Sequence, residues 1–303
     1  MKYEIQLSNQ GVFVRNKNGR LLWRRASGCT LLLVFLLPTQ FTRAGSATWN
    51  LNPSNGDWEM SRNWTPKTVP NGPDDIATFG VSNVTDLILS FQFDNEVNGI
   101  VFNAGASPFA ITVASDSSSE YVLTLSGVGI TNNSGITQNF ITDSAENASP
   151  GAIHFTNSAS AGELTVFTNN SQGETNLFDN STADSATLIA NQDANENAGG
   201  LISFLDDSLG GSCQVQVFGT GSLDISAHNA PGAAVGSIQG SGLVTLGGNN
   251  LTVGGNNLTT TFSGVIQDVG GVGGGVGGSL TKVGTGTLIF TGPNTYTGGT
   301  TVL

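Results

Sequence analysis

Residues 236–268 read GSIQGSGLVTLGGNNLTVGGNNLTTTFSGVIQD, and this stretch decides the fold class. Short apolar runs alternate with two nearly identical turns, Gly247-Gly-Asn-Asn250 and Gly254-Gly-Asn-Asn257. Asn and Gly tolerate the left-handed backbone conformation that tight corners require, so we expect an all-β chain with very short strands. The strands expected here are Leu243–Leu246, Leu251–Val253 and Phe262–Val265.

A loose repeat precedes this stretch and indicates stacked units. The segments Phe155-Thr-Asn-Ser158, Phe178-Asp-Asn-Ser181 and Phe204-Leu-Asp-Asp-Ser208 align on their first residue, which is Phe in all of them. Each is followed by a second apolar segment, which is Leu164–Val166, Leu188–Ile189 or Val215–Val217. Repeat periods of about 20–50 residues are typical of solenoids, and the spacing of these Phe residues falls in that range.

A strand-only unit of this length predicts one coil of a parallel β-helix. In that fold each strand pairs with its equivalents in the coils above and below, and inward apolar side chains stack on one another. An immunoglobulin-like sandwich is the competing all-β fold. It needs hairpin connections, and its strands would not match from unit to unit.

Charge is distributed unevenly along the 303 residues, whose net charge is −12. Residues 1–44 hold seven of the ten Lys and Arg, which leaves three basic residues against 21 acidic ones in the remainder. Binding to nucleic acid or to an anionic membrane depends on clustered Lys and Arg. The composition therefore excludes nucleic acid as a partner.

The basic N-terminal end has the pattern of a secretory signal peptide. Arg24-Arg25 precede the short apolar run Cys29–Leu37, and small residues follow up to cleavage sites near Ala44 or Ala47. The run is shorter than the ~18 residues that would span a bilayer. We expect residues 1–44 to be this signal peptide. Its basic region is unusually long, which is also compatible with translation from a later start codon. After cleavage only Cys213 remains, and we expect a buried, unpaired thiol.

Residues 45–81 differ from the rest because they contain Trp49, Trp58 and Trp64. A stacked fold needs an atypical terminal unit to cover its open end. We interpret the segment as a Trp-rich N-terminal cap. Clustered Trp side chains that bind carbohydrate are the alternative interpretation.

A search for catalytic or metal-binding patterns gives no site. The two histidines, His154 and His228, are far apart in the sequence and have no zinc-like spacing, so we expect positions on a coil face or at a corner. The carboxylate pairs are Asp74-Asp75, Asp193 with Glu196, and Asp206-Asp207. Neighbouring residues of a strand point to opposite faces, and we interpret these pairs as solvated turns. Ca²⁺ binding at such corners has only a weak signal.

Two further patterns argue against enzymes. Lyases that act on acidic sugars use Lys or Arg, but only Arg62, Lys67 and Lys282 follow the predicted signal peptide. The run Gly270–Gly278 has no Gly-Lys-Ser/Thr ending and is too poor in side chains to pack, so we expect a flexible loop. We therefore predict no enzyme activity, no catalytic residues, no cofactor and no metal.

The closing segment has the most specific pattern. Leu280-Thr-Lys-Val-Gly-Thr-Gly-Thr-Leu288, followed by Thr291-Gly-Pro-Asn-Thr-Tyr-Thr-Gly-Gly-Thr-Thr-Val302, resembles the autotransporter-associated β-strand repeat, also called the passenger-associated transport repeat. The resemblance implies a right-handed parallel β-helix that is exported to the surface of a Gram-negative-type bacterium, associated with its outer membrane, or secreted. No catalytic residues come with the repeat. A complete autotransporter ends in an outer-membrane β-barrel, which these residues do not contain, so we expect either a truncated chain, as a fragment or split reading frame, or export by another system.

The expected order is a signal peptide (1–44), a Trp-rich cap (45–81), a parallel β-helix (82–278) and one transport repeat (279–303). The predicted function is a non-catalytic surface or secreted stalk, with adhesion as one form of that role. The alternative is a β-helix that binds or degrades neutral polysaccharide. The expected partner is an extracellular ligand or surface, such as a glycan, and the last strand offers an edge for pairing.

Overall fold

Two units make up the computed structural model, which describes residues 4–8, 11–15, 45–89, 95–115, 120–145, 148–195 and 197–303. In the first unit, Met1–Phe41, strands β1 (Glu4–Ser8) and β2 (Gly11–Arg15) pair antiparallel. The apolar run of the predicted signal peptide and the cleavage site near Ala44 lie outside the described residues. The signal peptide therefore stays a prediction.

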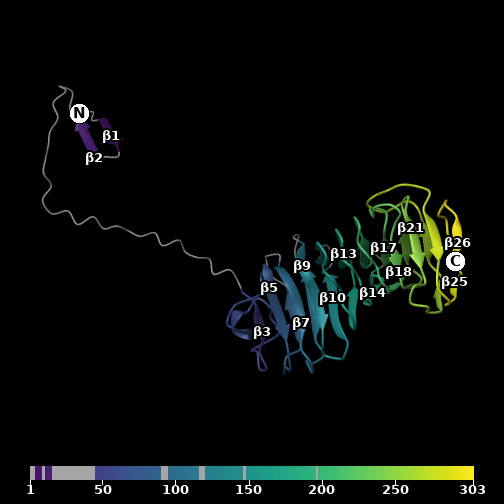
Figure 1. The fold of residues 1–303 in the computed structure, drawn as a ribbon, viewed down its shortest axis with the longest axis horizontal. Coiled ribbons are helices and arrows are strands. Elements are labelled where there is room, and N and C mark those ends of the chain that lie inside the picture. The colour runs from purple at the N-terminus through teal and green to yellow at the C-terminus, as the bar shows by residue number, and fades with distance from the viewer. Residues whose placement is uncertain are drawn as a thin grey trace. The chain divides into compact units, whose positions relative to one another are not determined.

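The second unit, Thr42–Leu303, is a stack of strands in three sheets (Figure 1). The long sheet has 11 strands: β3 (Ala47–Trp49), β4 (Trp64–Thr65), β5 (Gly72–Phe79), β7 (Asn95–Phe102), β9 (Tyr121–Asn132), β11 (Gly151–Phe155), β13 (Glu174–Leu177), β15 (Leu201–Phe204), β17 (Ser222–Asp224), β20 (Leu243–Thr245) and β23 (Val265–Gln267). The second sheet has nine: β6 (Asp86–Leu89), β8 (Ala110–Ser115), β10 (Gln138–Ser144), β12 (Thr165–Asn169), β14 (Thr187–Ala190), β16 (Gln214–Val217), β19 (Ser237–Gly240), β22 (Thr260–Phe262) and β25 (Leu288–Phe290). The short sheet has four: β18 (Ala234–Val235), β21 (Asn250–Val253), β24 (Ser279–Lys282) and β26 (Thr300–Val302).

The chain winds from sheet to sheet in parallel coils. Strand β11 of the long sheet is followed by β12 of the second sheet and then by β13, which pairs parallel with β11. Within the described part of this unit, the strand pair β3–β4 alone is antiparallel, and the 3-10 turn Ser61–Asn63 is the one helical element. For the described residues, the predictions of an all-β fold and of parallel coils are confirmed. No helix among the described residues is long and apolar enough to cross a membrane.

The interior of the stack is apolar because the strands alternate inward and outward side chains. At the start of β9, for example, buried Tyr121, Leu123 and Leu125 alternate with half-buried residues. Phe140 stacks on Phe167 of the next coil with ring centroids 4.9 Å apart, and Phe79 stacks on Phe102 at 5.2 Å. Such aromatic pairs stabilise the stack beyond the area that they bury.

One corner repeats in three successive coils and is built by Asn157, Asp179 and Asp206. All three residues have left-handed backbone conformations, with φ of 56°, 53° and 51°. The amide of Asn157 donates to Oδ2 of Asp179 at 2.8 Å, and the amide of Asp179 donates to Oδ2 of Asp206 at 3.2 Å. Asn and Asp suit the corner because they tolerate this conformation and their side chains satisfy the neighbouring coil.

This corner corrects the predicted alignment of the repeat. In the long sheet Phe155 is in register with Leu177, and Leu177 is in register with Phe204. Phe178 is one residue further on, half-buried at the corner, so the alignment of Phe178 with the other two Phe residues was wrong by one position. The left-handed residue that follows sets the register, and the aromatic side chain does not.

A second corner corrects a predicted strand. Phe262–Val265 is not one strand, because β22 ends at Phe262 and β23 begins at Val265 in a different sheet. Gly264 lies in the corner between them, where a Cβ atom would be 1.9 Å from the carbonyl oxygen of Gly242. Only glycine lets the two coils approach so closely.

Candidate functional site

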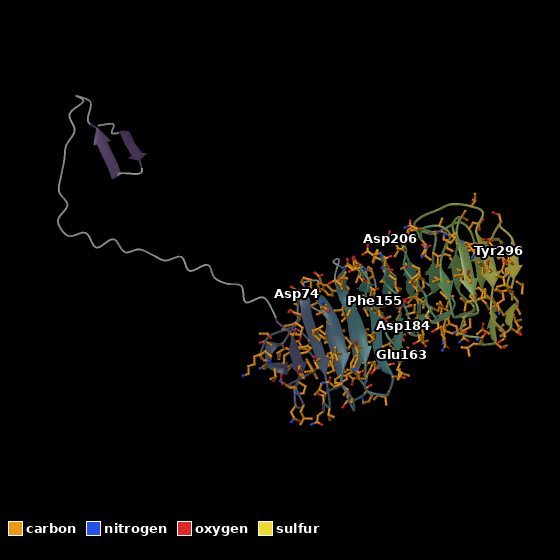
Figure 2. All side chains as sticks on the ribbon, in the orientation of Figure 1. Asp74, Phe155, Glu163, Asp184, Asp206 and Tyr296 are labelled. Carbon is orange, nitrogen blue, oxygen red and sulfur yellow. The ribbon has the colours of Figure 1, made fainter. Side chains whose placement is uncertain are left out.

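The closing repeat adds the last strands to the stack. Strand β24 pairs with β21, β25 with β22, and β26 with β24, all of them parallel. Between β25 and β26 the amides of Thr295 and Tyr296 donate to the carbonyl of Ile266, at 2.8 and 3.3 Å. The amide of Ile266 donates in turn to Oδ1 of Asn294 at 3.0 Å. The repeat thus contacts all three sheets, and Tyr296 packs half-buried against the core (Figure 2).

The lysine of the repeat closes its own corner. Lys282 is buried, and its Nζ donates to the carbonyl oxygens of Val283 and Gly284 at 2.5 and 3.1 Å. These two carbonyls follow β24 directly, where the chain leaves the sheet. A charged donor makes such hydrogen bonds stronger than a neutral one would. The geometry therefore gives Lys282 a structural role.

Asp268 joins the glycine run to the closing repeat. Its Oδ2 accepts hydrogen bonds from the Gly277 amide at 3.0 Å, the Thr297 amide at 3.1 Å and the Thr297 hydroxyl at 2.6 Å. Burial alone would raise the pKa of Asp268, but these hydrogen bonds and one from the Gly278 amide lower the pKa below its ordinary value. The carboxylate is therefore ionised at neutral pH.

The glycine run itself packs, which corrects the expectation of a loop too poor in side chains to do so. The Val272 amide donates to Oδ2 of Asp224 at 3.0 Å, and the Gly273 amide donates to Oγ of Ser226 at 2.9 Å. A Cβ atom on Gly271 would lie 2.2 Å from Oγ of Ser226. The missing side chains let the backbone reach buried acceptors on the preceding coils.

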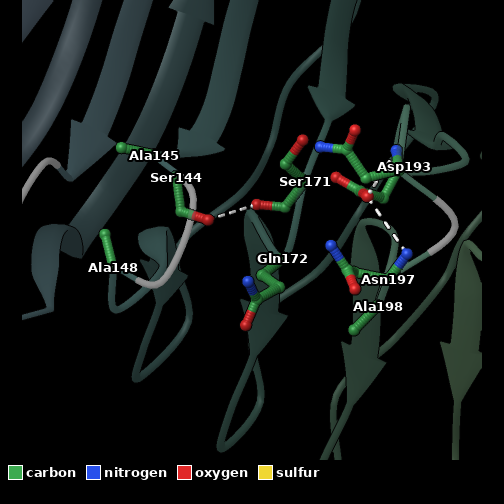
Figure 3. Close-up of a pocket in the computed structure, with 9 residues that line it drawn as sticks. Ser144, Ala145, Ala148, Ser171, Gln172, Asp193, Asn197 and Ala198 are labelled. Atoms are coloured by element: carbon green, nitrogen blue, oxygen red, sulfur yellow. Dashed lines mark hydrogen bonds between the residues drawn. The ribbon is translucent and has the colours of Figure 1, made fainter.

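A polar pocket of about 540 Å³ opens where the coil ends near Ser144, Ser171 and Asp193 meet (Figure 3). It is lined by Ser144, Ala145, Ala148, Ser171, Gln172, Asp193, Asn195, Asn197 and Ala198. The hydroxyl of Ser171 and the amides of Asn195 and Asn197 lower the pKa of Asp193. Burial raises the pKa of the nearby Asp143, and the charge of Asp193 adds to this effect.

The carboxylates that stood out in the sequence lie at different places in the described part of the stack. Asp74 and Asp75 are successive residues of β5, one exposed and the other buried. Asp206 belongs to the repeated corner, at the edge of the coils (Figure 2), and Asp207 is exposed beside it. Asp193 lines the polar pocket, and Glu196 lies outside the described residues.

The two histidines lie on a coil face and at a corner, as predicted. Both ring nitrogens of His228 are 2.7 Å from backbone carbonyl oxygens, those of Asn229 and Ser208. His154 lies on the outer face of β11, half-buried between inward Ile153 and Phe155.

The structure brings two glutamates to His154 that the sequence search missed. Glu120 precedes β9 and Glu174 opens β13, so the three residues come from successive coils of the long sheet. Their ligand atoms all lie within 4.8 Å of one another. Burial raises the pKa of Glu174, although the hydrogen bond from the Asn176 side chain partly opposes this effect. The coil register, which pairs Tyr121 with Gly151, is the signal that could have brought them together.

The three Trp side chains are part of the core. Trp49, Trp58 and Trp64 are at most 2% exposed. The centroids of Trp58 and Trp64 are 4.9 Å apart, and they lie 5.8 and 5.6 Å from the ring centroid of Phe79. None of these three rings offers an exposed face on which a sugar could stack.

Cys213 is fully buried, as expected for a small apolar residue. Burial raises the pKa of its thiol to about 12. A thiol with this pKa is inert, because the reactive form is the thiolate.

Comparison with known proteins identifies the closing segment. Residues 280–303 match the family model described as passenger-associated-transport-repeat. No curated protein and no solved structure matches the chain. The resemblance stated from the Leu280–Val302 pattern is thus confirmed.

Proposed function

We propose that this chain, which carries a passenger-associated transport repeat at residues 280–303, is a non-catalytic stalk that is exported to the bacterial surface as an autotransporter passenger. The observation that carries this proposal is the continuity of the repeat with the rest of the stack. Strand β25 extends the nine-stranded sheet that began at β6, and β24 extends the short sheet that began at β18. A repeat associated with exported passengers is therefore part of the same folded body as the preceding coils.

The N-terminal end supports export in the same way. Strand β3 begins at Ala47, whose backbone is paired with Ala77, so cleavage near Ala44 would leave the first strand whole, whereas cleavage after Ala47 would remove its first residue. The buried Trp cluster that follows suits the proposed role of a cap, which covers the first coil and keeps its apolar interior from water. By the resemblance, we propose that the coils are right-handed.

Surface labelling tests the proposal. Intact cells that express the gene are treated with an antibody against residues 45–303 and, separately, with a protease that cannot enter cells. We expect labelling of intact cells and loss of the protein on protease treatment, while a cytoplasmic marker survives. Protection of the protein until the cells are lysed would refute export to the surface.

A glycan-binding role is the second candidate, and the polar pocket at Ser171 and Asp193 favours it. Hydroxyl, amide and carboxylate groups line this pocket and match the hydroxyl groups of a neutral sugar. A glycan array with the wild type and with Asn195→Ala, an exposed pocket residue, tests the role. Binding that the variant loses would support it. If the wild type binds no glycan and does not degrade neutral polysaccharides, the glycan-binding role is refuted and the stalk role is the one that remains.

A further inference from the structure

The outer face of the long sheet carries a cluster of three metal-ligand side chains. Nε2 of His154 lies 4.0 Å from Oε1 of Glu120, and Glu174 completes a set whose ligand atoms are all within 4.8 Å of one another. Ligands bound tetrahedrally to zinc lie roughly 3.4 Å apart, given bonds of about 2.1 Å. The Glu120 side chain is 45% exposed, so it can close the remaining distance by a change of rotamer.

The neighbouring Asn176 amide contacts two of the three candidate ligands. Its Nδ2 donates to Oε2 of Glu174 at 2.7 Å and lies 3.3 Å from Nε2 of His154. The Asn176 amide therefore bridges the side chains of Glu174 and His154, two of the three candidate ligands.

A second observation on Asn176 concerns its side-chain oxygen. The residue is only 7% exposed, and its Oδ1 is buried without a hydrogen-bond partner among the described residues. Buried polar atoms of this kind are uncommon and call for a ligand or ion. Rotation of the side-chain amide would turn this oxygen toward His154 and Glu174 as a fourth ligand.

The chemistry of the set selects the class of metal. One imidazole and two carboxylates suit zinc and similar transition-metal ions, whereas Ca²⁺ prefers six or more oxygen ligands. The ring of His154 is held edge-to-face against Phe178 at 5.1 Å, which fixes its orientation.

We propose that Glu120, His154 and Glu174 bind one divalent transition-metal ion of the zinc class. The ion links three consecutive coils of the long sheet, at β9, β11 and β13, and stabilises them against separation. This inference is independent of the proposed stalk function, since it rests only on the placement of side chains on the sheet.

Calorimetric titration of the full chain with Zn²⁺ tests the proposal. Cys29→Ser is present in every sample, so that this thiol offers no competing ligand. We expect one Zn²⁺ per chain, visible absorption bands when Co²⁺ replaces it, and a rise in Tm with Zn²⁺. His154→Ala and Glu120→Gln should each weaken binding at least about tenfold. Glu163→Gln, an exposed acid away from the cluster, serves as the matched control and should change nothing.

Three results would overturn the proposal. The first is no stoichiometric binding by the wild type, and the second is binding that Glu163→Gln weakens as much as Glu120→Gln does. The third is a competition experiment in which Ca²⁺ displaces the bound metal ion as readily as added Zn²⁺ does. Glu120 is exposed and precedes its strand, so its variant should fold even if His154→Ala does not, which circular dichroism checks.

Discussion

Replacing Asp268 by Asn should loosen the contact between the glycine run and the closing repeat. Oδ2 of this residue accepts three hydrogen bonds, from the Gly277 amide and from the amide and hydroxyl of Thr297. A hydrogen bond to a charged acceptor contributes about 1 kcal/mol more than one to a neutral acceptor. Three of them give an upper limit of about 3 kcal/mol, and because they share one oxygen we expect a loss of about 2 kcal/mol.

Hydrogen exchange at the amides of Gly277 and Thr297 measures this loss directly. A change of about 2 kcal/mol corresponds to roughly 30-fold faster exchange. Asp207→Asn is the matched control, because Asp207 is exposed, and it should leave both amides unchanged. Unchanged exchange at Gly277 and Thr297 in Asp268→Asn would refute the role of the carboxylate.

The same carboxylate gives the closing repeat a dependence on pH. Because the folded-state pKa of Asp268 lies below its ordinary value of 3.8, the stabilisation is present above pH 3.8 and is lost as pH falls through the folded-state pKa. Wild type and Asp268→Asn should therefore differ in urea unfolding at pH 7 and converge in acid. A difference that persists at the lowest pH would contradict this account.

Three more predictions concern the core and the corners. Phe167→Ala should lower the free energy of unfolding by about 3–5 kcal/mol, because Phe167 is fully buried against Phe140 and Phe155; a loss below about 1 kcal/mol in urea unfolding would count against this packing. Gly264→Ala should cost about 3 kcal/mol, because its Cβ would meet a backbone oxygen at 1.9 Å. Gly255→Ala should cost less than about 0.5 kcal/mol, because a Cβ atom added there would have no neighbour within 4 Å. Equal costs for the two substitutions would show that the corner at Gly264 tolerates a side chain. In a Cys29→Ser background, Cys213 should resist a thiol reagent at pH 8 until the chain unfolds, since burial raises its thiol pKa to about 12; rapid labelling of the folded protein would contradict this burial.

The coil architecture was predictable because its signals are local. Turns such as Gly247-Gly-Asn-Asn250 and strands of three or four residues are visible without knowledge of distant contacts. The register was harder, since Phe155 and Phe178 look equivalent in sequence while the sheet pairs Phe155 with Leu177. The equivalent positions in successive coils are the left-handed corner residues, such as Asn157 and Asp179, and these cannot be recognised from a neighbouring Phe.

The side-chain clusters could not be predicted from residue spacing alone. Glu120, His154 and Glu174 are far apart in the sequence and unevenly spaced, and only the coil lengths bring them to one face. The glycine run was misjudged for a related reason. Its packing depends on buried acceptors, Asp224 and Ser226, that belong to a much earlier part of the chain.

The in-register parallel stack is the central claim, and pairs of engineered cysteines test it most directly. Thr168, Ile189 and Gln216 follow one another in the second sheet, half-exposed and in register. Neighbouring strands lie about 4.8 Å apart, within the range that a disulfide spans, whereas two coils exceed it. The account predicts that Thr168→Cys with Ile189→Cys oxidises to an intramolecular disulfide and that Thr168→Cys with Gln216→Cys does not. Failure of the first pair, or equal oxidation of both, would contradict it.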